Sequence, residues 1–184
     1  MISSDYRFEP DLFKRFIHKV FKSYTHKKYF RGHDVGQLCS FKIDEDDYLI
    51  INEFLKFDYL GTQDEFSSWK LIPYHQSEIN LSDDLTISEI NLEIKEIDLI
   101  EDDVTTIIDD KAKYHNKETR AIIFKFEDYE IAFEKEDCPF SIEIYIYEGH
   151  DLANIINHNP TFATTYNHLD DYNIQLERKL IIIK

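Results

Sequence analysis

The chain has 184 residues, a length typical of one folded domain with a hydrophobic core, so we expect residues 1–184 to form a single domain. Hydrophobic residues make up 42% of the chain, including 14 Phe and 12 Tyr, which argues against a disordered protein. The formal net charge is −16, which disfavours nucleic acids and anionic membranes as partners and favours basic surfaces.

Cysteine usage and hydrophobic runs bear on the compartment. The two cysteines, Cys39 and Cys138, are far apart and match no metal-binding or redox spacing. The first residues lack the apolar stretch of a signal peptide, and the longest aliphatic run, residues 180–183, is far too short to span a bilayer. These features together predict a reduced, cytoplasmic protein.

Residues 10 to about 25 carry the pattern of an amphipathic helix. The apolar positions recur at helical spacing: Phe13, Phe16, Ile17, Val20, Phe21 and Tyr24. Pro10 suits the first helical position, and Gly32 suits a stop after the end. The lysines and arginines of this segment lie off the apolar face, and we interpret them as a solvated surface rather than a nucleic-acid site.

The next segments favour strands. Residues 48–59 are apolar nearly all round, so a buried strand and a buried helix both fit, and the aromatic and β-branched content favours the strand. We predict a loop over residues 61–68 and a short strand over residues 69–73. Pro73 marks a sheet edge or a strand end, and Trp69 is expected in the core.

Residues 78–110 concentrate the negative charge. They hold twelve acids and one base, Lys95, for a net charge of −11, whereas residues 1–42 hold nine bases and four acids, for +5. Apolar residues alternate with acids through residues 92–99, with a shift of one position midway. That pattern predicts a strand with a β-bulge near residues 95–96, and residues 104–110 are expected to form a helical turn or a loop.

The segment 121–147 predicts a β-hairpin followed by a third strand. A two-residue turn at Glu127 and Asp128 places three apolar pairs on one face: Phe126 with Tyr129, Phe124 with Ile131, and Ile122 with Phe133. A slip of one residue would put glutamates in that layer, so the pattern specifies the register. Glu-Asp is an unusual two-residue turn, and a longer loop stays open as an alternative.

The last elements complete the expected fold. Asp151 is a suitable N-cap for a helix over residues 152–157. Residues 174–183 read as a strand, and their apolar end predicts a place inside the sheet rather than at its edge. The whole pattern indicates an α+β fold, with a largely antiparallel sheet and the N-terminal amphipathic helix packed on one face.

Candidate chemistry is sparse. The histidines His150, His158 and His168, with Asp170 and Asp171, lack the spacing of zinc ligands, although a metal-dependent hydrolase using them remains an alternative hypothesis. The chain has no Gly-x-Ser-x-Gly nucleophile elbow and no glycine-rich phosphate loop. We therefore expect a protein that is not an enzyme and that needs no metal or cofactor.

The segment 121–147, the step Glu148-Gly149-His150-Asp151-Leu152 and the acidic charge together resemble bacterial immunity proteins of polymorphic-toxin and contact-dependent growth inhibition systems. The resemblance covers roughly the C-terminal third of the chain. It implies a cognate toxin, often a nuclease, that is neutralised in a tight, non-catalytic complex.

Two binding hypotheses follow from the charge. The first is an inhibitor of a basic toxin, with the expected contacts in the acidic segment: Glu101, Asp102, Asp103, Asp109 and Asp110. The second is a DNA mimic that binds several DNA-binding proteins, which requires acids spaced like a phosphate ladder. Neither hypothesis involves nucleic acid or a membrane as a direct partner.

Overall fold

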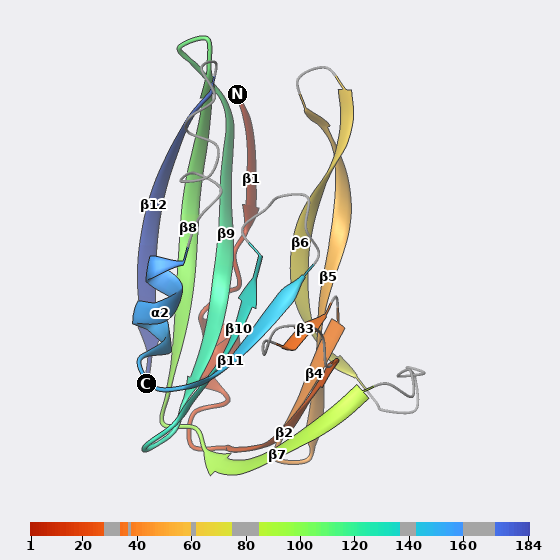
Figure 1. The fold of residues 1–184 in the computed structure, drawn as a ribbon, viewed down its shortest axis with the longest axis vertical. Coiled ribbons are helices and arrows are strands. Elements are labelled where there is room, and N and C mark those ends of the chain that lie inside the picture. The colour runs from red at the N-terminus through yellow and green to blue at the C-terminus, as the bar shows by residue number, and fades with distance from the viewer. Residues whose placement is uncertain (28–33, 37, 60–61, 75–84, 137–142, 160–171) are drawn as a thin grey trace.

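The computed structural model describes residues 1–27, 34–36, 38–59, 62–74, 85–136, 143–159 and 172–184. Within these residues two β-sheets face each other across a shared hydrophobic core (Figure 1). The described part holds two short helices, α1 (Asp11–Lys14) and α2 (Leu152–His158). Neither of these helices has the length or hydrophobicity needed to cross a membrane.

The larger sheet, sheet A, has seven strands. Its order is β12 (Tyr172–Ile183), β8 (Glu96–Ile108), β9 (Lys111–Lys125), β10 (Glu130–Lys135), β11 (Ile144–Gly149) and β3 (Asp34–Gly36). The seventh strand, β1 (Ile2–Tyr6), pairs in parallel with β9, and the other pairs of this sheet are antiparallel. Because β1 and β10 contact the same side of β9 at different heights, β9 forms the long spine of the sheet.

The smaller sheet, sheet B, has five strands. Its order is β6 (Thr62–Tyr74), β5 (Asp46–Tyr59), β4 (Leu38–Ile43), β2 (Val20–Lys27) and β7 (Leu85–Glu93), all antiparallel. The strand predicted over residues 48–59 is confirmed as part of β5. Residues 62–68 belong to β6, so the predicted loop is wrong for them. Pro73 does mark an edge, since β6 lies at one side of the sheet.

Interlocking aromatic rings join the two sheets. Phe21 and Phe41 of sheet B pack on Phe124 of sheet A, with ring centroids 5.0 and 5.2 Å apart, and Phe41 also lies 5.7 Å from Phe133. All four rings are fully buried or nearly so. Such rings bury large apolar areas and favour tilted or edge-to-face contacts, so this cluster is the main source of stability between the sheets.

The predicted hairpin is confirmed. Ile131 pairs with Phe124 and Phe133 pairs with Ile122, and the Phe126 amide donates to the Tyr129 carbonyl at 2.8 Å across the two-residue turn. The third strand is confirmed as β11, which pairs antiparallel with β10. Side-chain alternation was sufficient to predict this register because one face of the hairpin is wholly apolar.

The predicted N-terminal helix is wrong, and with it the α+β class. Only residues 11–14 are α-helical, and β2 begins at Val20. The pairing of β2 shifts between Phe21 and Ser23, so one extra residue allows both Phe21 and Tyr24 to face the core. A bulged strand thereby produces the three-residue spacing of a helix. The fold is mostly antiparallel β-sheet.

The predicted bulge near residues 95–96 is also wrong. The chain leaves sheet B at the end of β7 and enters sheet A at β8, with Asn91 at a positive φ of 56° just before this crossing. Buried Ile94 anchors the crossing, since its amide donates to the Lys19 carbonyl at 2.8 Å. The one-position shift of apolar residues within residues 92–99 therefore marks the place where the chain passes from sheet B to sheet A. Residues 104–108 continue β8 rather than forming the expected helical turn or loop.

The last strand is placed differently from the prediction. β12 forms an edge of sheet A rather than its interior. Ile181 and Ile183 pack into the core, whereas Leu180 and Ile182 on the other face are 48% and 53% exposed. An apolar strand end indicated burial on both faces, but only one face of β12 is covered at this end. The helix predicted over residues 152–157 is confirmed as α2, and buried Trp69 is confirmed as a core residue.

Candidate functional site

Strand alternation divides the acidic run in β8 between two faces of sheet A. Ile97 and Leu99 face the core, so Glu101 and Asp103 continue the face toward sheet B, and Asp102 lies on the opposite face. The three β8 acids among the five predicted contacts are therefore not brought together on one face. Asp109 and Asp110 lie farther along, at the turn between β8 and β9.

Asp102 is a buried structural residue. Its two carboxylate oxygens accept from Nε and Nη2 of Arg178 at 2.6 and 2.7 Å, and the Asp102 side chain is 0% exposed. Arg178 also donates from Nη1 to the Ile156 carbonyl at 3.2 Å. This bidentate ion pair links the edge strand β12 to β8, and the third hydrogen bond of Arg178 links β12 to the end of α2.

Glu101 and Asp103 are likewise neutralised inside the sheet. Glu101 lies 3.6 Å from the Arg7 guanidinium, and Asp103 lies 2.5 Å from His115 and 3.4 Å from Lys117. Burial raises the Asp103 pKa, but His115 and Lys117 together outweigh it and hold that pKa below its usual value. A partner using these acids would have to displace bases that already hold them.

Asp109 and Asp110 are exposed at the tip of the β8–β9 hairpin. Their φ angles of 51° and 58° are the left-handed pair that a tight hairpin turn requires, which aspartate tolerates better than most residues. Lys111 and Lys113 are also exposed beside them. The tip therefore carries bases as well as acids, and its role as a contact stays a prediction.

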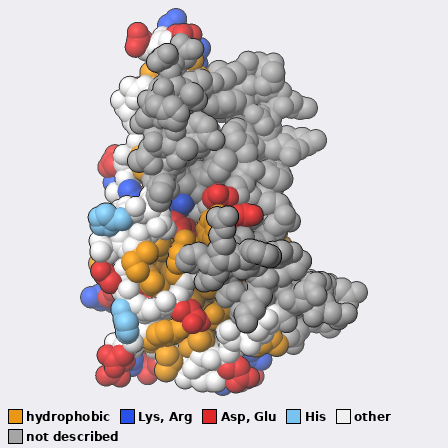
Figure 2. All heavy atoms as spheres, in the orientation of Figure 1, with side chains coloured by type: hydrophobic (Ala, Val, Ile, Leu, Met, Phe, Trp, Pro, Cys, Tyr) orange, Lys and Arg blue, Asp and Glu red, His pale blue; other side chains and the backbone are white. Residues whose placement is uncertain are grey.

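At the other end of β9 the structure gathers acids from two turns. We call this set the acidic corner: Glu127, Asp128, Glu130, Glu148 and Asp151. The pairing of β10 with β11 sets Glu130 opposite Gly149 and Ile131 opposite Glu148, which brings the β9–β10 turn and the β11–α2 turn together. None of the five forms an ion pair with a lysine or arginine among the described residues. Acidic side chains are visible at the lower left of Figure 2, where the β9–β10 turn lies in Figure 1.

Neutral donors hold the acidic corner in place. Glu130 Oε2 accepts from the Leu152 amide at 2.8 Å, and so caps the start of α2. Asp151, at the N-cap position with φ of 56°, makes no side-chain cap, which corrects its predicted role. Glu148 accepts from the Tyr24 hydroxyl. These hydrogen bonds order Glu130 and Glu148 without cancelling their charge.

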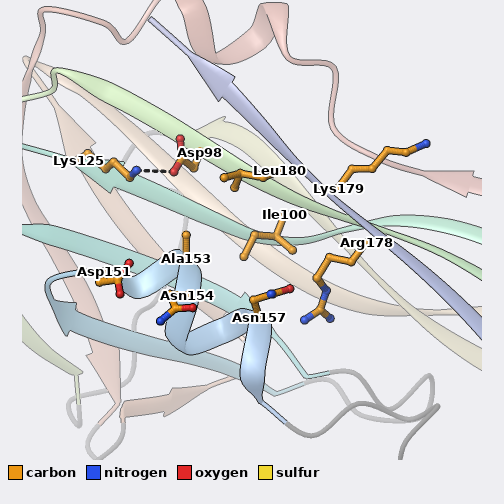
Figure 3. Close-up of a pocket in the computed structure, with 10 residues that line it drawn as sticks. All are labelled: Asp98, Ile100, Lys125, Asp151, Ala153, Asn154, Asn157, Arg178, Lys179 and Leu180. Carbon is orange, nitrogen blue, oxygen red and sulfur yellow. Dashed lines mark ion pairs between the residues drawn. The ribbon is translucent and has the colours of Figure 1, made fainter.

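A groove of about 480 Å³ opens beside the acidic corner, between α2 and the outer face of β8 and β12 (Figure 3). Ile100, Leu180 and Ala153 give it apolar walls, and Asn154 and Asn157 of α2 supply amides. Its charged lining residues are Asp98, Lys125, Asp151, Arg178 and Lys179. The volume lies within the range of small-ligand pockets.

Asp98 lies at one end of the groove with its side chain fully buried. Its Oδ2 is 2.5 Å from Lys125 Nζ, which also contacts Glu96 at 3.1 Å. Asp98 Oδ1 accepts no hydrogen bond from any described residue. Burial raises the Asp98 pKa, Lys125 opposes that rise, and nearby Glu96 and Glu130 reinforce it. The structure thus leaves a buried acceptor on the groove lining.

The predicted histidine site gains no support from the described residues. His150 is exposed, His158 Nδ1 lies 2.7 Å from the Asn154 carbonyl, and His168 falls outside the described part of the chain, as do Asp170 and Asp171. No group of three or more potential metal ligands occurs among the residues that are described. The thiol of Cys39 is buried, and burial raises its pKa, so it is a poor nucleophile. Cys138 also lies outside the described residues.

Comparisons with protein-family models, with curated proteins and with solved structures find no match for this chain. The geometry therefore provides the functional argument. Sequence reasoning missed the acidic corner, although the correctly predicted hairpin register already implied that Glu127 and Asp128 lie at its turn.

Proposed function

We propose that this protein is a cytoplasmic immunity protein that binds and neutralises a cognate basic toxin, of the kind found in polymorphic-toxin and contact-dependent growth inhibition systems. The supporting observation is the acidic corner. Glu127, Asp128 and Asp151 are exposed on two adjoining turns, Glu130 and Glu148 lie at the adjoining strand ends, and none of the five forms an ion pair with a described base. A nuclease is the favoured toxin, because its active face must be basic to hold phosphates.

The corner fits this role better than the acids of β8. Asp102 and Arg178 form a buried pair, and separating such a pair leaves a charge unpaired in a dry environment. Four of the five corner carboxylates are exposed, and only Glu130 and Glu148 accept hydrogen bonds, from neutral donors, so a basic partner can approach the corner without breaking an ion pair among the described residues. The net charge of −16 adds long-range attraction, which raises the rate of association and weakens as salt is added.

The test first looks for a toxin gene next to the gene of this protein and then expresses the basic domain that it encodes. Absence of such a neighbouring gene would count against the proposal. We expect an equimolar amount of this protein to abolish toxin activity and to form a one-to-one complex whose affinity falls as salt rises. Neutralisation that persists after reversal of both Glu127 and Asp128 would overturn the assignment to the corner. Equal binding to several unrelated DNA-binding proteins would instead support a DNA mimic and contradict a cognate immunity protein.

A further inference from the structure

The groove shown in Figure 3 and the acidic corner form one continuous surface. Asp151 belongs to both, and Glu130 of the corner is close enough to Asp98 of the groove to raise its pKa. A partner that lies on the corner therefore reaches the groove. The groove differs from the corner in having apolar walls, so it can select a side chain by shape as well as by charge.

The bases of the groove do not make it a site for anions. Lys125 is held by Asp98 and Glu96, and Arg178 is held on two sides by Asp102. Lys179 pairs with Glu177 at 3.1 Å, and its side chain points away from the groove in Figure 3. The lining itself holds two acids and three bases. When Glu130 and the pairing acids Glu96, Asp102 and Glu177 are counted, six carboxylates face four cations, including Lys184, and the local field attracts positive charge.

The shape of the groove suits a long side chain with an apolar stem. Ile100 and Leu180 of sheet A face Ala153 of α2, and Leu180 is 48% exposed, so its apolar surface is open to cover. The buried, unpaired Asp98 Oδ1 and the side-chain carbonyls of Asn154 and Asn157 are hydrogen-bond acceptors on the groove lining. Of the natural side chains, arginine combines an aliphatic stem with a planar head that donates to several acceptors at once.

We propose that this groove holds an arginine side chain of the basic partner, with its guanidinium donating to Asp98 and its stem covering Ile100 and Leu180. The identity of the partner rests on the proposed function. The preference for arginine rests on the groove alone, so it can be measured without the partner.

The probe is Nα-acetyl-arginine methylamide, compared with the citrulline analogue, which has nearly the same shape but no charge. Titration of the isotope-labelled protein is followed by two-dimensional NMR. We expect the arginine probe to shift the amide signals of α2 and of residues 178–182 in β12, and to bind about fivefold or more tightly than the citrulline probe. Equal binding of the two probes, or shifts confined to other elements, would overturn the proposal.

Two variants and a control locate the site. Asp98→Asn keeps the shape of the side chain but removes its charge, and we expect it to weaken arginine binding about tenfold. Ala153→Leu narrows the groove without changing its charge and should reduce binding similarly. Asp46→Asn, an exposed acid on sheet B, is the matched control and should leave binding unchanged. Wild-type affinity in both groove variants, each with an unchanged circular dichroism spectrum, would contradict the assignment.

The two proposals fail separately. If the arginine probe does not bind but reversal of Glu127 and Asp128 still abolishes toxin binding, the immunity function stands and the arginine inference is overturned. If the probe binds as expected but the adjacent toxin does not, the groove assignment stands and the proposed function is overturned.

Discussion

The two ends of β9 show how one strand serves two different environments. From Ala121 to Phe124 every side chain is fully buried, some against the aromatic core and some beneath α2. From Lys111 to Lys117 the strand is mainly polar, and its inner face is partly open. The boundary is a bulge at Arg120, where the pairing with β8 shifts. Apolar burial stabilises one end, and cross-strand ion pairs organise the other.

The comparison explains why most acids of β8 are not available for binding. At the polar end, Glu177, Asp103, Lys117 and Asp5 occupy one row across β12, β8, β9 and β1. Lys117 of this row and His115, two residues before it on β9, both bind Asp103. The acidic corner lies at the opposite end of β9. The one base in the row of Glu130 there, Lys125, is bound by Glu96 and Asp98. Free negative charge is left where the sheet ends, not where the sequence is most acidic.

The largest expected effect lies in the apolar end. Phe133→Ala removes a ring that packs on Phe41, Phe124 and Tyr24, and should lower the free energy of unfolding by about 3–5 kcal/mol. Chemical denaturation measures this change. The matched change at the polar end, His115→Ala, should cost about 1 kcal/mol or less, because that side chain is 24% exposed. Similar losses of unfolding free energy in the two variants would contradict the claim that apolar burial stabilises one end of β9 far more than ion pairs stabilise the other.

The next effect concerns the buried pair on the outer face. Arg178→Met leaves Asp102 charged and buried, and should lower the free energy of unfolding by about 3 kcal/mol. Adding Asp102→Leu to that variant removes the stranded charge and should restore part of the loss. A double variant less stable than Arg178→Met would show that the pair contributes more than the apolar replacement can supply.

A smaller effect depends on pH. His115 and Lys117 lower the Asp103 pKa from its ordinary 3.8 in the folded state, despite burial. The ionised carboxylate therefore stabilises the fold above that pH, and this contribution is lost as the pH falls through the lower folded pKa. Asp103→Asn should be less stable than wild type at pH 6, by about 1 kcal/mol or less, and equally stable near pH 2. A difference that grows on acidification would contradict this account.

The smallest effect is expected at the β8–β9 turn. Asp110 has a φ of 58°, a conformation that glycine adopts without strain. Asp110→Gly should therefore change the free energy of unfolding by less than about 1 kcal/mol, because relief of backbone strain offsets the added freedom of the unfolded chain. Differential scanning calorimetry of the variant and the wild type measures this change. A large loss would show that the aspartate side chain itself stabilises the tip.

The sequence was most informative where local pairing decides the structure. In the β9–β10 hairpin, Ile122, Phe124, Ile131 and Phe133 share one face, and the register was predictable because a slip of one residue would put glutamate on that face. The N-terminal segment was misleading because the bulge between Phe21 and Ser23 gives a strand the spacing of a helix. Nothing local distinguishes the two, since the choice is made by pairing with β4 and β7.

The candidate site was less predictable than the fold. Asp102 binds Arg178, which is 76 residues away in the sequence. This contact depends on the register of β12 against β8. The charge of Glu127 and Asp128 was visible in the sequence. Whether a lysine or arginine lies close enough to pair with them depends on which strands end beside their turn, and the sequence does not show that. Charge density along the chain was therefore a poor guide to charge left free on the surface.

The most direct test compares the two acidic turns at opposite ends of β9. One variant carries Glu127→Lys and Asp128→Lys, and its matched control carries Asp109→Lys and Asp110→Lys, so both change the net charge equally. The measurement is the dissociation constant for the basic domain encoded beside the gene, by isothermal calorimetry at one salt concentration. We expect the first variant to bind at least about tenfold more weakly and the second to stay within about threefold of wild type. Equal weakening in the two variants, or a larger loss in the second, would contradict the claim that the acidic corner is the contact surface.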